Sequence, residues 1–201
     1  MKSGHFLADW RDDGVWVRVA AMLLSPDRSL LLVVHVQARL AAAMDGKDAV
    51  VERSAKLVKA ARRLDIPLIV LELNPASLGG TVRPIADLAA ADEVIAGTHY
   101  SCAREPALIE RLQAAGRTQI VLCGMEAHVC VLQTALGLVE KGYRVTVVAD
   151  AAGSRQPSDH AAAMTRLVQN GVTVATSEMV MFEWLQHAGN AAFTDVLALI
   201  K

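Results

Sequence analysis

Cys130 is the residue of this sequence best placed to do chemistry. It lies in the stretch GMEAHVC (124–130), which follows an apolar run and precedes a helical pattern. At the start of a helix, unpaired backbone N–H groups and the helix dipole stabilise a thiolate and lower its pKa. The same amides, near 126–130, can hold the oxyanion formed by attack on an acyl carbon. The position predicts a cysteine nucleophile; a small side chain that only fills the core is the other interpretation.

His35 is a second candidate, because it ends the apolar run SLLLVVHV (29–36), just before Gln37. Ligands of open parallel sheets bind beyond the carboxyl ends of the strands, where the strand order reverses. If the chain winds in the usual way, the strands that precede His35 and Cys130 are neighbours there. A histidine about 3–4 Å from the sulfur could then act as its general base. A histidine that is simply buried and hydrogen-bonded is the alternative.

The pattern of the chain predicts the elements that would position these two residues. Apolar runs rich in Val, Leu and Ile predict six strands, at 29–36, 67–73, 93–97, 118–124, 144–150 and 172–177. Helical patterns are found at 47–64, 106–115, 127–141 and 158–170, and in the C-terminal stretches SEMVMFEWLQHA and AAFTDVLALIK. Strands that alternate with helices predict an α/β fold of three layers, Rossmann-like, with a six-stranded, mostly parallel sheet covered by helices on both faces. Residues 1–28 fall outside this alternation, so we expect an N-terminal extension before a single domain at 29–201.

Composition excludes several classes of partner. Twenty basic and 21 acidic residues leave a net charge of −1, and aromatic residues make up only 4%, so no nucleic acid partner is expected. The first strand is followed by QARLAAAMDG, which holds no phosphate-binding glycine motif, and no cofactor is expected. No apolar run reaches the roughly 20 residues of a membrane span. The cysteines Cys102, Cys123 and Cys130 form no CxxC motif, which favours a reducing, cytoplasmic location. Cys123, inside a strand, is expected to be a core residue.

Longer stretches of the sequence resemble the isochorismatase-like cysteine hydrolase family over about residues 29–201, and in particular its small isochorismatase domain proteins. The stretches that carry the resemblance are LLLVVHVQ, LELNPASLGGTV, GMEAHVCVLQTALGLVEKGYRVTVVADAAGSR and GVTVATSEMVMFEWL. The resemblance implies a hydrolase for a small amide or related C–N bond. It also implies a non-proline cis peptide, expected here at Met125–Glu126, and assembly into homo-oligomers.

The resemblance also implies an Asp–Lys–Cys triad, of which only Cys130 is kept. The family Asp falls on His35 and the family Lys on Gly97 in AGTHYS (96–101), with His99 and Arg104 as the nearest cationic candidates. A buried Lys without its carboxylate would cost about 3–5 kcal/mol, so the two substitutions relieve each other. No metal site is expected, because ELNPASLGG lacks the histidines that some relatives carry there; Glu72 and Asn74 are read as polar lining or turn residues.

Two functions remain open from the sequence. In the first, Cys130 is the nucleophile and His35 the base of a remodelled hydrolase site. The residues expected to bind its small-molecule substrate are Gln37, Glu72, Gly97, His99, Met125, Glu126 and His128. In the second, the chain is an inactive pseudoenzyme kept as a binding or assembly module. The C-terminal helices supply apolar residues that suit either a homo-oligomer interface or the cover of the sheet, namely Met179, Met181, Phe182, Trp184 and Phe193.

Overall fold

A single six-stranded parallel sheet forms the centre of the molecule. The computed structural model describes residues 8–10, 16–18 and 23–201. The sheet has the order β5-β4-β3-β6-β7-β8. Its strands are β3 (Ser29–Val34), β4 (Leu68–Leu73), β5 (Val94–Gly97), β6 (Gln119–Met125), β7 (Arg144–Gly153) and β8 (Thr173–Ala175). The predicted strands and the three-layer α/β fold are therefore confirmed.

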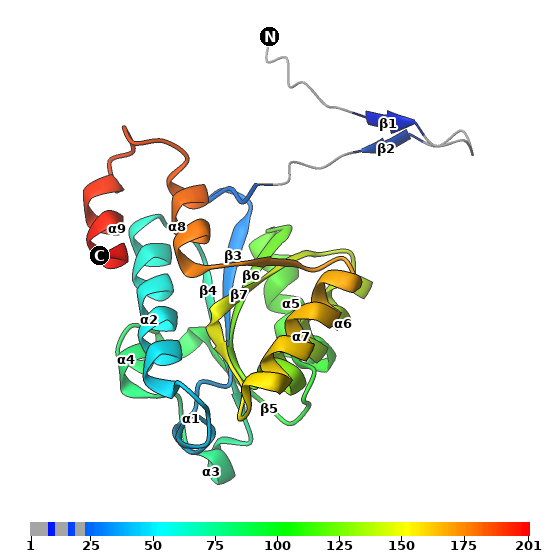
Figure 1. The fold of residues 1–201 in the computed structure, drawn as a ribbon, viewed down its shortest axis with the longest axis vertical. Helices are drawn as coiled ribbons and strands as arrows, with labels where there is room; N and C mark the ends of the chain where they lie inside the picture. Colours follow the sequence, from blue (N-terminus) through cyan, green and yellow to red (C-terminus); the bar gives the residue numbers. More distant parts are fainter. Residues whose placement is uncertain (1–7, 11–15, 19–22) are drawn as a thin grey trace.

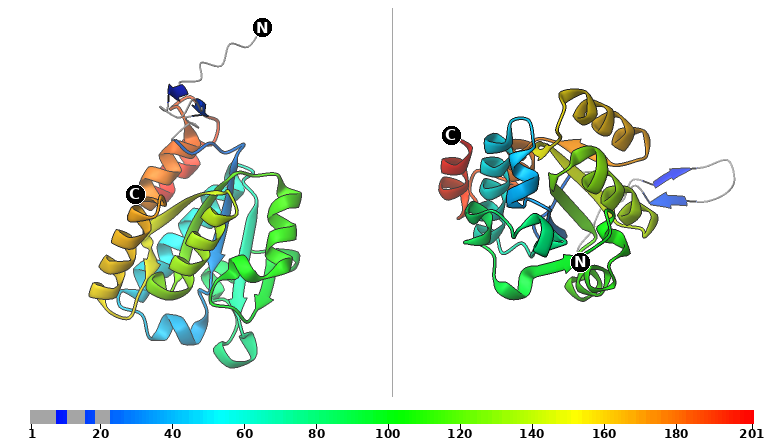
Figure 2. Two further views of the ribbon diagram at one scale, coloured as in Figure 1. Left: turned by 90° about the vertical axis from the view of Figure 1, so that its right-hand side faces the viewer. Right: turned by 90° about the horizontal axis from the view of Figure 1, so that it is seen from below.

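Helices cover both faces of this sheet, as Figures 1 and 2 show. One face carries α2 (Lys47–Arg63), α4 (Arg83–Ala86), α8 (Ser177–Leu185) and α9 (Phe193–Ile200), and the other carries α5 (Pro106–Ala115), α6 (Leu132–Glu140) and α7 (Pro157–Gln169). Short elements complete the chain, namely α1 (Ala38–Ala42), α3 (Pro75–Leu78), and the turns η1 (Ala91–Glu93), η2 (Cys102–Arg104) and η3 (Ala127–Val131). The predicted helix at 127–141 is thus a π-helical turn followed by α6.

The alternation of side chains along the central strands explains the two cores. On β3, Leu31 and Val33 pack on the α2 face, whereas Leu30 and Leu32 pack on the α5–α6 face. Successive side chains of a strand point to opposite faces, so a strand buried on both sides must be apolar throughout. Cys123 on β6 is fully buried in the α2-side core, which confirms its predicted place.

The expected neighbours β3 and β6 lie side by side and bring their carboxyl ends together. Their register pairs Val34 with Gly124, the last ladder position before His35. Gly124 has φ +134°, and a Cβ there would lie 1.9 Å from the carbonyl oxygen of Val34. Only glycine allows β6 to approach β3 so closely at this point.

The N-terminal residues are described in part. The strands β1 (Ala8–Trp10) and β2 (Trp16–Arg18) pair with each other in a separate antiparallel sheet. The predicted extension 1–28 also includes residues 1–7, 11–15 and 19–22, which lie outside the described part of the chain. Leu24 is buried in the core, and the backbone N–H of Ser25 donates to Oε1 of Gln119 at 2.9 Å.

The C-terminal helices chiefly cover the sheet. Met181 and Trp184 are buried in the α2-side core, so of the two alternatives for these residues the structure supports the cover of the sheet. Phe193 packs against the same core and is partly buried. Met179 is 50% exposed and Phe182 42% exposed. Among the described residues, no helix has the length and apolar character needed to cross a membrane.

Candidate active site

A cavity of about 360 Å³ opens beyond the carboxyl ends of the central strands, and Cys130 lines it. Its apolar and aromatic wall consists of Leu40, Leu73, Leu78, Tyr100 and Val129. Its polar wall consists of Asn74, Ser77, Thr98, Glu126 and Cys130. A larger groove of about 910 Å³ lies between α5 and α6, but Cys130 does not line it. The cavity beyond the carboxyl ends of the strands is therefore the candidate active site.

Cys130 lies on the π-helical turn η3, directly after β6. The cis peptide expected at Met125–Glu126 is present. The carbonyl oxygen of Glu126 accepts from the N–H groups of Val129 and Val131, each at 3.1 Å, which holds the turn. Cys130 is only 2% exposed. Burial raises the pKa of its thiol to about 11, although a backbone hydrogen bond from Glu126 lowers it. The prediction of a lowered pKa is wrong, because burial outweighs the effect of the helix start.

His35 follows β3 in a left-handed conformation, with φ +52°. It is 2% exposed, and Nε2 of its ring lies 3.4 Å from Sγ of Cys102. Burial lowers the pKa of His35 to about 4, and the charge of Glu105 opposes this effect only in part. Among the contacts of the described residues, Nδ1 of His35 has no hydrogen-bond partner, and no hydrogen bond joins His35 to Cys130. His35 is thus neutral at physiological pH, and its sulfur partner is Cys102.

Cys102 is held in the η2 turn between β5 and α5. Its backbone N–H donates to Oγ1 of Thr134 at 2.9 Å, which ties the turn to α6. Burial raises the pKa of its thiol to about 12; the hydrogen bond of Thr134 lowers it, and the proximity of Cys130 and Glu105 raises it further. Cys102 is therefore a protonated thiol in contact with the histidine.

Glu105 fills the space that a side chain at position 97 would take. A Cβ on Gly97 would lie 2.4 Å from Oε1 of Glu105. The same oxygen accepts from the N–H of Thr98 at 2.8 Å and the N–H of His99 at 2.9 Å, and it lies 2.8 Å from Nδ1 of His99. Burial alone would raise the pKa of Glu105, but these donors hold it below its ordinary value. Thr98 and His99 thus bind the carboxylate of Glu105 in the space that Gly97 leaves open.

Three other residues predicted to bind the substrate lie outside the cavity lining. Gln37 is fully buried: Nε2 donates to the carbonyl oxygens of Leu73 and Gly79, and Oε1 accepts from the N–H of Leu73 at 2.7 Å. Glu72 accepts from the N–H and the hydroxyl of Thr81, at 2.6 and 2.7 Å. Met125 is fully buried in the core on the α2 face. None of these three lines the cavity.

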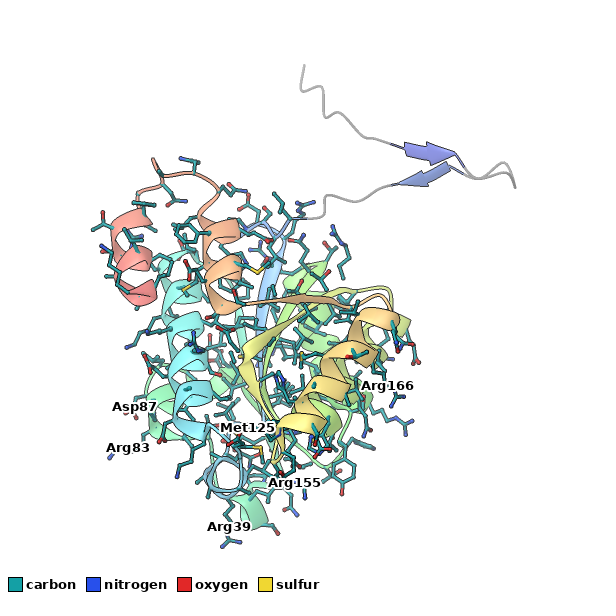
Figure 3. All side chains as sticks on the ribbon, in the orientation of Figure 1. Arg39, Arg83, Asp87, Met125, Arg155 and Arg166 are labelled. Carbon is teal, nitrogen blue, oxygen red and sulfur yellow. The ribbon has the colours of Figure 1, made fainter. Side chains whose placement is uncertain are left out.

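Glu126 and His128 lie on the other side of Cys130. Oε1 of Glu126, in the cavity wall, accepts from Nε of Arg155 at 2.6 Å. Nδ1 of His128 lies 3.0 Å from the hydroxyl of Ser154, and Nε2 lies 3.7 Å from Asp159. Figure 3 shows Arg155 at the same end of the molecule as α1 and α3. Of the residues predicted from the sequence, Cys130, Glu126 and Asn74 line the cavity directly.

Comparison with known proteins gives the family. The isochorismatase domain matches residues 29–179. The chain belongs to the isochorismatase family. Isochorismatase domain-containing protein 1 of Danio rerio is 34% identical over 183 residues; the match covers 89% of this chain but only 62% of that protein, so the chain spans less than two thirds of its length.

Solved structures of other proteins share the fold. The MAR1 ribonuclease of Caenorhabditis elegans superposes with a TM-score of 0.84 at 33% identity, covering 89% of this chain and 92% of that chain. The YcaC gene product of Escherichia coli, an octameric hydrolase of unknown specificity, gives the same TM-score at 22% identity; 90% of this chain and 91% of that chain are covered. At that identity the likeness shows the fold alone.

Two residues of this isochorismatase-family site were not predicted from the sequence. Cys102 was noted only in the count of cysteines, and Glu105 was not singled out at all. The signal for Glu105 is its place eight residues after Gly97 and directly before the helix that begins at Pro106, within reach of the loop that follows Gly97. Among the described residues, no group of three His, Cys, Asp or Glu side chains is arranged to hold a metal ion.

Proposed function

We propose that this chain is a cysteine hydrolase that cleaves a small amide or a related C–N bond through Cys130. The observation that carries the proposal is the place of Cys130: its side chain lines a 360 Å³ cavity at the carboxyl end of β6. Membership of a hydrolase family supports it. The thiol sulfur attacks the carbonyl carbon as its proton passes to His35, backbone amides near 126–130 hold the oxyanion, the amine leaves with that proton, and water releases the acyl group as an acid and restores the thiol.

His35 is the proposed base; its ring contacts Sγ of Cys102, and no hydrogen bond joins it to Cys130 among the described residues, so the proton must pass between groups that do not touch in the resting site. Moving a proton from Cys130, with a pKa of about 11, to His35, with a pKa of about 4, is unfavourable by roughly 10 kcal/mol in the resting site. The thiol must therefore lose its proton as the bond to the substrate forms. We expect slow turnover that accelerates with rising pH.

A screen of small amides tests the proposal. The parent should release ammonia or amine, and Cys130→Ala should abolish this release. Cys123→Ala is the matched control, because it removes a buried thiol in the α2-side core that neither lines the cavity nor contacts His35. Activity that survives in Cys130→Ala, or that is lost only in Cys123→Ala, contradicts the assignment.

A second candidate is a binding module without catalysis. It is favoured by one observation: Nε2 of His35 contacts Cys102, which leaves Cys130 as a protonated thiol. Restoring the family triad discriminates the two functions, and the restored protein needs three changes, His35→Asp, Gly97→Lys and Glu105→Ala, because Glu105 occupies the space beside Gly97. Activity only in the triple variant supports the binding module; activity in the parent supports the hydrolase.

The proposed ligand is a small molecule, and the proposed assembly is a homo-oligomer in the cytoplasm. Met179 and Phe182 are the exposed apolar residues of α8 that support an interface. The octameric state described for the E. coli protein supports the same expectation. All three cysteines are free thiols, which suits a reducing compartment. The cavity wall holds no basic side chain among the described residues, so the ribonuclease activity in the name of the C. elegans protein is not extended to this chain.

A further inference from the structure

Three arginines gather at the amino ends of the central strands, the end of the sheet opposite the Cys130 cavity. Arg28 directly precedes β3, Arg117 lies two residues before β6, and Arg144 is the first residue of β7. These strands are neighbours, and their first residues lie side by side in register. Figure 1 shows this end at the start of β3, away from α1 and α3. The seven residues of β6 span the distance between the two ends, roughly 20 Å at about 3.3 Å per residue.

None of the three arginines forms an ion pair with a carboxylate among the described residues. Arg117 donates to the carbonyl oxygens of Pro26 and Asp27, which are uncharged acceptors. Burial lowers the pKa of Arg144, and the charge of Arg28 lowers it further. The guanidinium groups of Arg28 and Arg144 therefore lie close enough to repel each other.

Two carboxylates lie near Arg28 without pairing with it. Asp27 precedes it in the chain, and its side chain forms no ion pair with any described residue. Glu183 lines the same surface groove as Arg28, and its Oε2 accepts from the backbone N–H of Leu24 at 2.7 Å. Direct pairing thus leaves the positive charges of Arg28 and Arg144 unneutralised.

A small pocket of about 120 Å³ opens beside Arg144, at the amino ends of β6, β7 and β8. Its polar lining consists of Gln119, Tyr143, Arg144, Thr146 and Thr173, and it holds no Asp or Glu among the described residues. Leu24 lines both this pocket and the groove that Arg28 lines, so the two hollows adjoin. Sites for whole ligands measure about 300–1,000 Å³, so this pocket suits one charged group of a larger molecule.

We propose that this amino-end pocket binds the phosphate group of a soluble phosphate monoester, with Arg28 and Arg144 as its cationic partners. A guanidinium fork matches the oxygens of a phosphate and forms two charge-assisted hydrogen bonds with them. A phosphate monoester carries close to two negative charges at neutral pH, which balances the two arginines. The hydroxyl groups of Thr146 and Thr173 donate to the remaining oxygens. The site is separate from Cys130 and does not depend on the proposed hydrolase activity.

Phenyl phosphate and phenyl sulfate test the site, because they share a shape and differ by one negative charge at about pH 7.5. Their binding to the full chain is measured by NMR titration at constant ionic strength. We expect phenyl phosphate to shift the backbone amides of Arg144, Thr146 and Thr173 and to bind about fivefold or more tightly than phenyl sulfate. Equal affinities, shifts confined to the Cys130 cavity, or no binding at about 10 mM would each overturn the proposal.

Arginine variants assign the binding to its residues. Arg28→Gln and Arg144→Gln should each weaken phenyl phosphate about fivefold or more. The matched control is Arg83→Gln, which removes the same charge from an exposed position of α4 that lines neither hollow and should leave the affinity unchanged. Unchanged affinity in both pocket variants overturns the assignment, and an equal loss in Arg83→Gln shows a response to net charge alone, which also overturns it. Cys130→Ala should bind phenyl phosphate as the parent does.

A sedimentation assay separates a soluble ester from a lipid headgroup with the same chemistry. The protein is mixed with phosphatidylcholine vesicles, with and without phosphatidic acid. We expect the protein to remain in the supernatant in both cases, because the pocket takes a single group at the surface of the sheet end. Sedimentation with the phosphatidic acid vesicles that Arg144→Gln abolishes would assign the phosphate to a lipid and overturn the soluble ligand.

Discussion

The buried His35 should make the fold sensitive to acid. In the unfolded chain its imidazole has the ordinary pKa of 6.5, whereas burial lowers the folded value to about 4. Between these two values the unfolded state binds more protons than the folded state, so stability rises as the pH rises through this window. From neutral pH down to pH 4, this histidine alone should cost about 3 kcal/mol of the free energy of unfolding.

His35→Asn tests this reasoning, because asparagine tolerates the left-handed backbone found at position 35. Urea unfolding of parent and variant is followed at a series of pH values between about 4 and 7. The difference in stability between the two proteins should change by about 3 kcal/mol across the series, with the parent losing more on acidification. His187→Asn, at an exposed histidine, is the matched control. A difference that stays constant to within about 1 kcal/mol would refute the assigned protonation state of His35.

Three further substitutions test the packing behind the site. Gly97→Ala should lower stability by about 1–3 kcal/mol, because the new Cβ meets Oε1 of Glu105 at 2.4 Å; adding Glu105→Ala should relieve part of this cost in a double-mutant cycle, and strict additivity would contradict the contact. Gln37→Ala should cost about 2–4 kcal/mol in urea unfolding, since it removes the partner of two buried backbone groups of Leu73 and of the part-buried carbonyl oxygen of Gly79, and a cost below about 1 kcal/mol would show that the amide does not anchor the wall. Gly124→Ala should cost more than about 4 kcal/mol or prevent folding, and a parent-like thermal midpoint would refute the close approach of β6 to β3.

Much of the fold follows from local patterns in the sequence. The continuous apolar runs predict the six buried strands, and the winding rules for parallel sheets correctly make β3 and β6 neighbours. The predicted helix at 106–115 is found as Pro106–Ala115, and Gly116 adopts the left-handed conformation typical of a residue just after a helix. These features depend on residues close together in sequence, which is why they can be read without coordinates. The division into an extension at 1–28 and a domain at 29–201 stays a prediction.

The electrostatics of the site could not be read in the same way. The helix start predicted a lowered pKa for Cys130, but its depth of burial, which the sequence does not contain, raises the pKa to about 11. The sequence shows that position 97 has no side chain. That Glu105 occupies the resulting space depends on the path of the loop between β5 and α5, which the sequence does not show. The contact of His35 with Cys102 joins residues 67 positions apart. Such contacts are set by tertiary packing and not by local pattern.

The most direct test of the account is to find which cysteine carries the acyl group. The parent protein is incubated with an activated ester or amide of a small uncharged acid, quenched in acid, and analysed by peptide mass spectrometry. We expect one acyl adduct on Cys130 that hydroxylamine removes, and none in Cys130→Ala. An adduct on Cys102, or an unmodified Cys130 when the substrate is consumed, would contradict it.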